Sequence, residues 1–199
     1  MSENTQGDKM HKVEASVDCD VPISIAYDQW TQFEEFPRFM KNIESVEQRG
    51  DTHLHWVASV AGQRKEWDAE IVEQEPDRLI SWKSTSGTLN NGAVLFEVLA
   101  PGQCRIKLVM TYAPEGVVEK AGSALGLLKA QIEGDLGRFK RYIENRQVPS
   151  GAWRGEVHDA VEGKPNTQGG IVGKTPAEAL EEKERGADAG MPSRRKSQY

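Results

Sequence analysis

The middle of the chain consists of strand-like segments that follow one another with very short connections. Turn signals such as Gly50-Asp51, Ala61-Gly62 and Pro101-Gly102 separate them. Connections this short join antiparallel neighbours, because parallel strands need a crossover of about a dozen residues or more. The sequence therefore predicts an antiparallel meander with strands at residues 43–49, 52–60, 63–74, 78–85, 92–99 and 103–113.

A further strand and two short helices are expected ahead of this meander. Apolar residues from Val13 to Cys19 alternate with polar ones, which is the period of a half-buried strand. The alternation stops before Pro22, a residue that suits the first turn of a helix. We therefore expect a helix over 23–31, followed by a short aromatic turn over 33–39.

The last predicted element is a long amphipathic helix over residues 115–146. Its apolar residues recur at steps of three and four and form one stripe, which needs a partner surface that the sheet can provide. The predicted fold class is therefore α+β. It is a curved antiparallel sheet of about seven strands wrapped around a long C-terminal helix, with two short helices after the first strand. Such a sheet leaves a cavity between itself and the helix it grips.

Composition limits the folded domain to about residues 11–147. Of the five Trp, five Phe and four Tyr, only Trp153 and Tyr199 lie beyond residue 150. A segment so poor in apolar side chains cannot offset the entropy of ordering it. We therefore expect a disordered N-terminus over 1–10 and a mostly disordered tail over 148–199. A capping box predicts a short helix over 176–185 within the tail, which makes the tail a candidate site for a protein partner.

Charge and cysteine content narrow the class of protein. Lys plus Arg number 25 and Asp plus Glu number 31, a net charge of −6 that disfavours nucleic-acid binding. The polar start of the chain does not resemble a signal peptide, and no apolar run reaches the roughly 18 residues of a membrane helix. Two cysteines are too few for a disulfide scaffold. We therefore expect a cytoplasmic protein that does not insert into a membrane.

Three segments and the order of the elements resemble a known superfamily. The segments are Asp20-Val21-Pro22, the run from Trp30 to Met40, and the run from Gly134 to Phe139. They are similar to the START-like superfamily and, within it, to the polyketide cyclase/dehydrase and coenzyme Q-binding branch. The resemblance covers about residues 11–147 and implies a helix-grip fold with a hydrophobic cavity. Members include aromatase/cyclases, lipid and quinone carriers and ribosome-associated toxins, so the fold alone does not decide the function.

Strand alternation predicts which side chains form the wall of that cavity. A two-residue turn at Ala61-Gly62 pairs Trp56 with Trp67 and His55 with Asp68. One face is then apolar and faces the helix, whereas the other carries charges and faces solvent. The predicted ligand-binding residues are Trp56, Trp67, Ile80, Trp82, Ser84, Phe96, Leu108, Met110, Tyr112, Leu125 and Leu128. Such a wall suits an aromatic or isoprenoid ligand, and the alternative is that these side chains simply fill the core.

Catalysis would require polar groups that this wall largely lacks. Cyclisation and dehydration of a polyketide need one group that removes a proton and another that stabilises the enolate. The inward strand positions hold no Asp, Glu, His, Lys or Arg, so Ser84 and Tyr112 are the candidate catalytic residues. Arg38, Arg64 and Lys65 lie near enough to strand or helix ends to reach the mouth.

Two other clusters have both a structural and a functional interpretation. His53 and His55 lie opposite two carboxylates, a set that a divalent metal accepts, but a solvated ladder of ion pairs explains them better. No metal and no cofactor are therefore predicted. Cys19 and Cys104 belong to strands that should be neighbours; buried small side chains are the favoured interpretation and a redox pair is the alternative.

The function that these observations favour is binding of a hydrophobic small molecule by a carrier or sequestering protein. The expected ligand is a lipid, a quinone or an aromatic polyketide-like compound. A polyketide aromatase/cyclase or dehydrase is the first alternative. A protein-interaction module that resembles the ribosome-associated toxins is the second.

Overall fold

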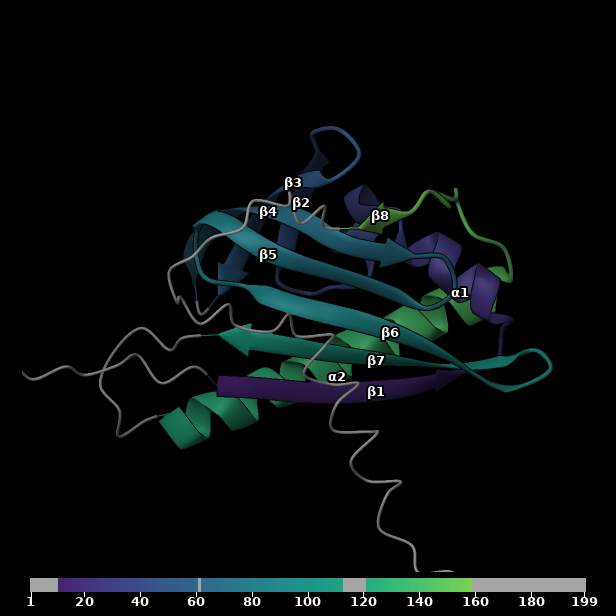
Figure 1. Cartoon of the computed structure of the whole chain (residues 1–199). Coiled ribbons are helices and arrows are strands. Elements are labelled where there is room, and N and C mark those ends of the chain that lie inside the picture. Colours follow the sequence, from purple (N-terminus) through teal and green to yellow (C-terminus); the bar gives the residue numbers. More distant parts are fainter. Residues whose placement is uncertain (1–10, 61, 113–120, 159–199) are drawn as a thin grey trace, which may run out of the picture. The chain divides into compact units, whose positions relative to one another are not determined.

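The computed structural model describes residues 11–60, 62–112 and 121–158 (Figure 1). In chain order the elements are β1 (His11–Cys19), α1 (Ile23–Trp30), the 3-10 helix η1 (Phe33–Arg38), β2 (Ile43–Gln48), β3 (His53–Val60), β4 (Gln63–Glu75), β5 (Leu79–Gly87), β6 (Asn91–Ala100), β7 (Gln103–Tyr112), α2 (Ala121–Arg146) and β8 (Val157–His158). Strands β2 to β7 lie within two residues of the predicted segments. Outside the described residues lie 1–10, the predicted helix start at 115, and 159–199 with the predicted helix over 176–185.

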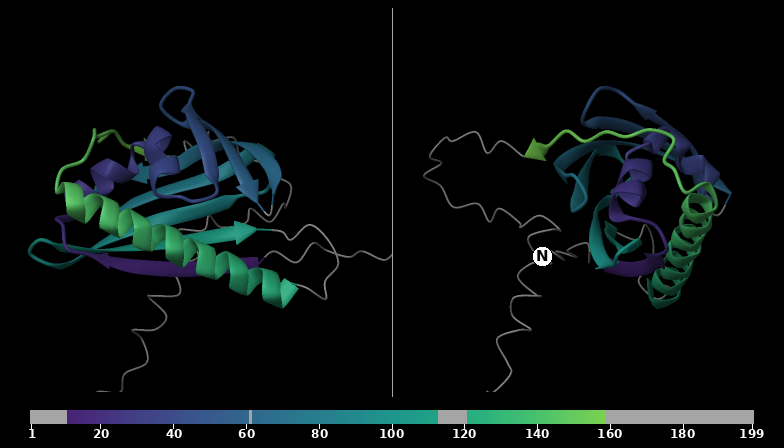
Figure 2. Two further views of the ribbon diagram at one scale, coloured as in Figure 1. Left: turned by 180° about the vertical axis from the view of Figure 1, so that it is seen from behind. Right: turned by 90° about the vertical axis from the view of Figure 1, so that its right-hand side faces the viewer.

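The main sheet is antiparallel and runs in the order β1-β7-β6-β5-β4-β3-β2. Strands β2 to β7 follow one another as a meander, and β1 closes the opposite edge beside β7, where Cys19 is the register partner of Cys104. Figure 2 shows that the sheet curls and that α2 crosses its open side. The predicted α+β helix-grip fold with seven main strands is therefore confirmed.

Aromatic side chains from the two short helices and from α2 form the centre of the core. Trp30 lies edge-on to Phe139 with the ring centroids 4.9 Å apart, and Phe39 contacts the same ring at 5.0 Å. Edge-to-face pairs of this kind add about 0.5–1.5 kcal/mol beyond the burial of the rings. The short helices therefore tie α2 to the rest of the core.

The apolar stripe of α2 is buried most deeply in its C-terminal half. Ile132, Leu136, Phe139 and Ile143 are each at most 5% exposed and follow the predicted steps of three and four. Leu128, one turn earlier, is only partly buried. The C-terminal half of α2 is thus packed tightly against the core, whereas the turn at Leu128 is only partly buried. No helix in the described part of the chain is long and apolar enough to cross a membrane.

Gly92 on β6 sets the position of a tryptophan ring on the neighbouring strand. Its register partner on β5 is Trp82, whose indole ring lies against it. A Cβ atom at residue 92 would be 2.5 Å from Cζ2 of Trp82 and 2.7 Å from the carbonyl oxygen of Val109. Only glycine leaves room for this close approach, so the orientation of Trp82 depends on a residue without a side chain.

The folded domain continues past residue 147, where the sequence analysis placed its boundary. After α2 the chain passes over α1 and reaches β8, which pairs antiparallel with β4 (Figure 1). Arg154 forms ion pairs with Asp28 and Asp77 on the way. Residues 148–158 are therefore part of the domain rather than of a tail. Composition could not reveal this, because backbone pairing and single charged side chains hold the segment in place.

Candidate functional site

A cavity of about 560 Å³ lies between the inner face of the sheet and α2. This volume is within the range of about 300–1,000 Å³ that small-molecule sites occupy. The wall is mainly apolar and is formed by residues from α1, η1, strands β2 to β5, strand β7 and α2, together with the connections next to them. The cavity occupies the space that the loosely covered turns of α2 leave beside the sheet.

Two tryptophan side chains of the β3–β4 hairpin form part of this wall. Its register is the predicted one, with Val60 opposite Gln63 and Trp56 opposite Trp67. The two indole rings stack with centroids 5.7 Å apart and an angle of 5° between their planes. Phe36 of η1 meets Trp56 edge-on at 5.5 Å, which holds the stack from the helical side. A planar apolar surface is thus presented to the cavity.

The structure brings seven of the eleven predicted ligand-binding residues together in the cavity wall. They come from four strands and from α2, and their inward orientation follows the predicted alternation along the strands. They are Trp56, Trp67, Ile80, Trp82, Leu108, Met110 and Leu128.

Three of the other four predicted residues do not border the cavity, and the side chain of the fourth is not described. Ser84 accepts a hydrogen bond from the backbone N–H of Asn90 at 3.2 Å and pairs with the side chain of Asn91. Phe96 is 5% exposed in the core, edge-on to Tyr27. Leu125 packs against the core without bordering the cavity. The side chain of Tyr112 lies outside the described residues.

Sequence reasoning missed the contribution of the short helices to the wall. Trp30, Phe33, Phe36 and Met40 all border the cavity. Their spacing of three and four was visible in the sequence, but it indicated only that they face the core. Whether a core-facing residue meets another side chain or an open space depends on how the helices dock, which no local pattern encodes.

A buried carboxylate also borders the cavity. Asp135 on α2 is 7% exposed, and its Oδ1 accepts hydrogen bonds from the backbone N–H of Lys41, at 2.9 Å, and from Arg138. Arg138 in turn donates from Nε to the carbonyl oxygen of Phe39 at 2.9 Å. The expectation that the inward strand positions hold no charged group did not cover the helix, which supplies Asp135, and it is wrong for Lys65 on β4, which borders the cavity.

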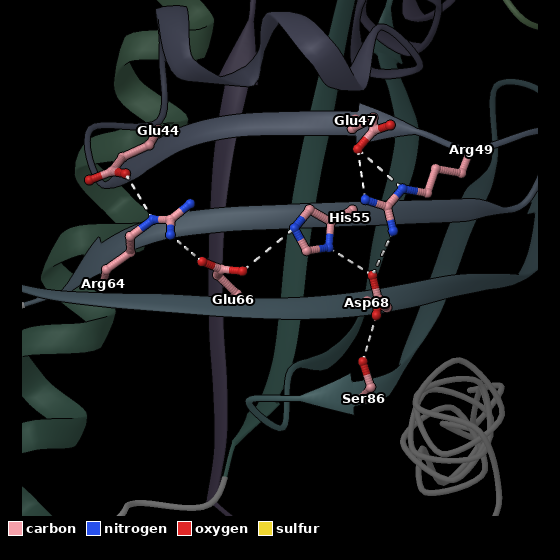
Figure 3. A network of polar contacts seen from close by, with 8 residues as sticks. All are labelled: Glu44, Glu47, Arg49, His55, Arg64, Glu66, Asp68 and Ser86. Carbon is pink, nitrogen blue, oxygen red and sulfur yellow. Dashed lines mark hydrogen bonds and ion pairs between the residues drawn. The ribbon is translucent and has the colours of Figure 1, made fainter.

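A network of charged residues on the β3–β4 hairpin, which includes His55, Arg64, Glu66 and Asp68, lies on the opposite face of the sheet (Figure 3). His55 Nδ1 is 2.7 Å from Asp68 Oδ1, and Ser86 donates to the other oxygen of Asp68 at 2.6 Å. Hydrogen bonds from Ser86 and His55 hold the pKa of Asp68 below its ordinary value. Arg64 pairs with Glu66 in the same ladder. Of the predicted cross-strand pairs, His55 with Asp68 is present, whereas Glu70 pairs with Lys83.

The metal alternative for this face finds no support among the residues that the structure describes. No group of three His, Cys, Asp or Glu in these residues is arranged to hold a metal ion. His53 Nδ1 contacts Thr52 Oγ1 at 3.0 Å, and Glu70 pairs with Lys83 at 3.2 Å. Two of the four candidate ligands are thus engaged with other partners.

The two cysteines lie side by side in the core. Cys19 and Cys104 are register partners on β1 and β7, are 1% and 0% exposed, and are reduced. A hydrogen bond with Cys104, together with burial, raises the pKa of Cys19. Because both side chains are almost completely buried, we interpret these residues as small apolar side chains of the core.

Sequence comparison relates the chain to one protein family. A family model described as "Polyketide cyclase / dehydrase and lipid transport" matches residues 19–141. An uncharacterised 17.2 kDa protein of Streptomyces lincolnensis is 48% identical over 149 residues, which span 74% of this chain and 99% of that protein. The matched region contains most of the cavity wall.

Two solved structures share the fold. The Zhui aromatase/cyclase from Streptomyces superposes with a TM-score of 0.57 at 16% identity, over 73% of this chain and 100% of that one. A START superfamily protein from Mycobacterium smegmatis superposes with a TM-score of 0.55 at 14% identity, over 68% and 96% of the two chains. The resemblance inferred from the sequence is thereby confirmed at the level of family and fold.

Proposed function

Because the chain belongs to the polyketide cyclase/dehydrase and lipid transport family, we propose that its cavity binds a hydrophobic small molecule and holds it as a carrier or sequestering protein does. The single observation that carries this proposal is the cavity of about 560 Å³ beneath α2. A filled core would leave no such space, since protein interiors are packed as densely as organic crystals.

The wall supports an apolar ligand with an aromatic or isoprenoid body. The stacked rings of Trp56 and Trp67 offer a flat surface, and Ile80 and Leu108 line the cavity from the neighbouring strands. The indole N–H of Trp82 is already used inside the protein, because it donates to Asn90 Oδ1 at 3.3 Å. Such surfaces bind by excluding water from apolar area, which is worth about 25 cal/mol per Å².

A cavity-filling substitution tests this proposal. Ala58, which is 2% exposed, borders the cavity, whereas Val98 on β6 is 68% exposed. The neutral fluorescent probe N-phenyl-1-naphthylamine should bind the unaltered protein, and Ala58→Phe should weaken binding at least about tenfold because it occupies the space. Val98→Phe adds the same ring outside the cavity and should leave affinity unchanged.

A second variant keeps the test decisive if Ala58→Phe is unstable. Leu128→Trp enlarges a partly buried side chain on the helical wall and should also lower affinity. Thermal unfolding of each variant separates loss of binding from loss of fold. If the unaltered protein does not bind the probe, or if both filled variants bind it as well as Val98→Phe does, the proposal fails.

Asp135 favours a second candidate function, catalysis of polyketide cyclisation or dehydration. A carboxylate in an apolar cavity is a group that can remove an acidic proton next to a carbonyl. Ser84 supports this role poorly, since its hydroxyl is hydrogen-bonded outside the cavity wall. Asp135 is itself held by Arg138 and by the backbone of Lys41, which favours a positioning role and therefore the carrier.

A small surrogate reaction distinguishes the two functions. 3-Hydroxy-1-tetralone loses one molecule of water to give 1-naphthol, which is the chemistry of a dehydrase on a minimal ring system. An enzyme would accelerate this reaction, and Asp135→Asn would abolish the acceleration while the protein still binds N-phenyl-1-naphthylamine. A carrier would bind the probe and leave the rate at that of buffer.

A further inference from the structure

Asp135 on α2 has one carboxylate oxygen that is bound within the protein and one that is not. Its Oδ1 accepts hydrogen bonds from the backbone N–H of Lys41, at 2.9 Å, and from the guanidinium group of Arg138. No donor among the described residues reaches its Oδ2. Because both oxygens of a carboxylate are acceptors, the group keeps unused acceptor capacity at Oδ2.

This unpartnered oxygen is open to a ligand in the cavity. Asp135 borders the cavity, and its side chain is only 10% exposed. Within the described part of the chain, the side-chain polar atoms that are both unpartnered and fully enclosed belong to Trp56, Asp77 and Ser81. Oδ2 of Asp135 is not among them, so protein atoms do not seal it off. A carboxylate that is nine-tenths buried thus offers a free acceptor at the wall.

Further polar side chains lie close to this acceptor. Gln131, one turn earlier on α2, borders the cavity and shares a helix face with Asp135. Asn42 borders the cavity directly after the residue whose N–H binds Asp135. Its carbonyl oxygen accepts the backbone N–H of Ser59 at 2.8 Å, next to the inward-facing Ala58 on the strand that carries the tryptophan stack. The polar groups therefore gather at one corner of a flat apolar wall.

The charge of Asp135 is already compensated inside the protein. Arg138 pairs with it and also donates from Nε to the carbonyl oxygen of Phe39 at 2.9 Å, which fixes the guanidinium group in place. A cationic ligand group would be repelled by Arg138, and an anionic group would be repelled by the carboxylate. A neutral O–H group avoids both costs and donates the hydrogen bond that Oδ2 lacks. Hydrogen bonds to an ionised acceptor are stronger than neutral ones.

From these contacts, and on the premise that the cavity binds a hydrophobic molecule, we infer that the ligand carries a hydroxyl group that donates to Asp135 Oδ2. The flat body of the ligand lies against Trp56 and Trp67, and its O–H group reaches the polar corner. The ligand class is therefore a neutral phenol or another hydroxylated aromatic compound. A site built around such a hydrogen bond rejects the analogue without the hydroxyl group, because the buried acceptor is then left unpaired.

Three naphthalenes of similar size test this inference by calorimetric titration at neutral pH, where 2-naphthol is un-ionised. 2-Naphthol donates a hydrogen bond, 2-methylnaphthalene has a methyl group in place of the hydroxyl group, and 2-acetylnaphthalene carries an oxygen that only accepts. The unaltered protein should prefer 2-naphthol to 2-methylnaphthalene by at least about tenfold. Burial of apolar area alone would give the opposite order, since 2-methylnaphthalene is the more hydrophobic compound.

Asp135→Asn converts the free acceptor into a donor. The two donors that bind Oδ1 hold the amide oxygen in that position, so the NH2 group replaces Oδ2. Affinity for 2-naphthol should fall at least about tenfold, and affinity for 2-methylnaphthalene should change by less than about twofold. The variant should bind 2-acetylnaphthalene more tightly than the unaltered protein does. A purely structural role of Asp135 would instead weaken all three compounds alike.

Glu133→Gln is the matched control. Glu133 lies on the same helix, is 53% exposed and pairs with Lys129 at 3.8 Å. Its replacement removes the same charge by the same chemical change without touching the cavity, so the affinity for all three compounds should stay unchanged. Thermal unfolding of each variant shows whether the fold is retained. If Asp135→Asn does not fold, the order of affinities in the unaltered protein decides the question.

The outcomes separate this inference from the proposed function on which it rests. If 2-methylnaphthalene binds the unaltered protein as tightly as 2-naphthol does, or if Asp135→Asn changes both affinities equally or neither, the hydroxyl assignment is overturned while hydrophobic binding stands. An equal loss of 2-naphthol affinity in Glu133→Gln would reveal a general effect of charge and would overturn it as well. If none of the three compounds binds, the proposed function itself fails.

Discussion

Gln29 and Ser150, 121 residues apart in the chain, hydrogen-bond to each other in both directions. The backbone N–H of Ser150 donates to Gln29 Oε1 at 3.0 Å, and Gln29 Nε2 donates to Ser150 Oγ at 3.2 Å. Gln29 is completely buried on α1, and its Nε2 also donates to Glu35 Oε2 at 3.1 Å. The segment after α2 therefore provides the partners that a buried amide requires.

Two truncations measure what this segment contributes to stability. A chain that ends after Gln147 loses Ser150, the partner of Gln29 Oε1, and the strand β8, whereas a chain that ends after His158 keeps both. The shorter chain should lose about 2–4 kcal/mol of unfolding free energy relative to the longer one, because the buried Oε1 of Gln29 is left without its donor and the pairing of β8 is lost. Urea unfolding measures the difference. Superimposable curves for the two truncated chains would contradict the assigned role of residues 148–158.

Glu35 should make the unfolding free energy of the domain depend on pH in the acidic range. Burial alone would raise its pKa, but hydrogen bonds from Ser150, Tyr142 and Gln29 outweigh that effect and hold the pKa below its ordinary value. The ionised form therefore stabilises the fold above the unfolded-state pKa of about 4.3. This contribution is lost as the pH falls from there through the folded-state pKa.

In Glu35→Gln, the unfolding free energy should therefore fall less steeply with decreasing pH below about pH 4.3. Glu133→Gln is the control, since Glu133 is 53% exposed on α2 and has a single ion pair with Lys129 at 3.8 Å. Chemical unfolding between pH 7 and pH 3 compares the slopes. A slope for Glu35→Gln that matches those of the control and the unaltered protein would show that the contacts of Glu35 do not stabilise its charge.

Gly92→Ala should damage the cavity through Trp82. The added methyl group would lie 2.5 Å from the indole ring and 2.7 Å from the carbonyl oxygen of Val109, so the ring must move. We expect a loss of about 1–3 kcal/mol of unfolding free energy and weaker binding of N-phenyl-1-naphthylamine.

Gly126→Ala provides the contrast for this experiment. A Cβ at Gly126 meets nothing within 4 Å, and the residue lies within α2. Alanine there should raise the unfolding free energy by up to about 1 kcal/mol, because glycine is the poorer helix former. Thermal unfolding and probe titration of both variants test the pair, and an affinity unaltered in Gly92→Ala would show that Trp82 does not shape the site.

The cysteine thiols should be unreactive in the native protein. Cys19 and Cys104 are buried, and the hydrogen bond with Cys104 together with burial raises the pKa of Cys19. Ellman's reagent at pH 8 should therefore react at least about a hundredfold more slowly with the folded protein than with the urea-unfolded chain. Rapid modification of two thiols without loss of the fold would disprove their burial.

The register of the β3–β4 hairpin illustrates how far local patterns reach. Alternation and the Ala61-Gly62 turn predicted that Trp56 faces Trp67 and His55 faces Asp68, and both pairs are present in the structure. A hairpin with a two-residue connection has few alternatives, since a shift by one residue would turn every charged side chain toward the core. The expected proximity of Cys19 and Cys104 came instead from the predicted fold, in which the first and last strands of the main sheet are neighbours.

Asp135 and Ser150 illustrate what lies beyond such patterns. Asp135 borders the cavity because α2 docks with that turn over it, and Ser150 reaches Gln29 because the chain turns back over α1. The hydrogen bonds of Asp135 with Lys41 and of Ser150 with Gln29 join residues 94 and 121 positions apart. At such separations, spacing in the sequence carries no information on distance in space. Loop length and helix docking decided them.

The sequence by itself thus determined the main strands and helices, the register of the β3–β4 hairpin and the helix-grip class, because these follow from periodicity and from turns a few residues long. The tertiary structure alone decided which core-facing side chains border an empty space and where the domain ends. It placed Trp30 and Asp135 at the cavity and residues 148–158 on the domain. The physical reason is that a cavity is defined by the relative docking of whole elements, whose fit depends on all side chains between them at once.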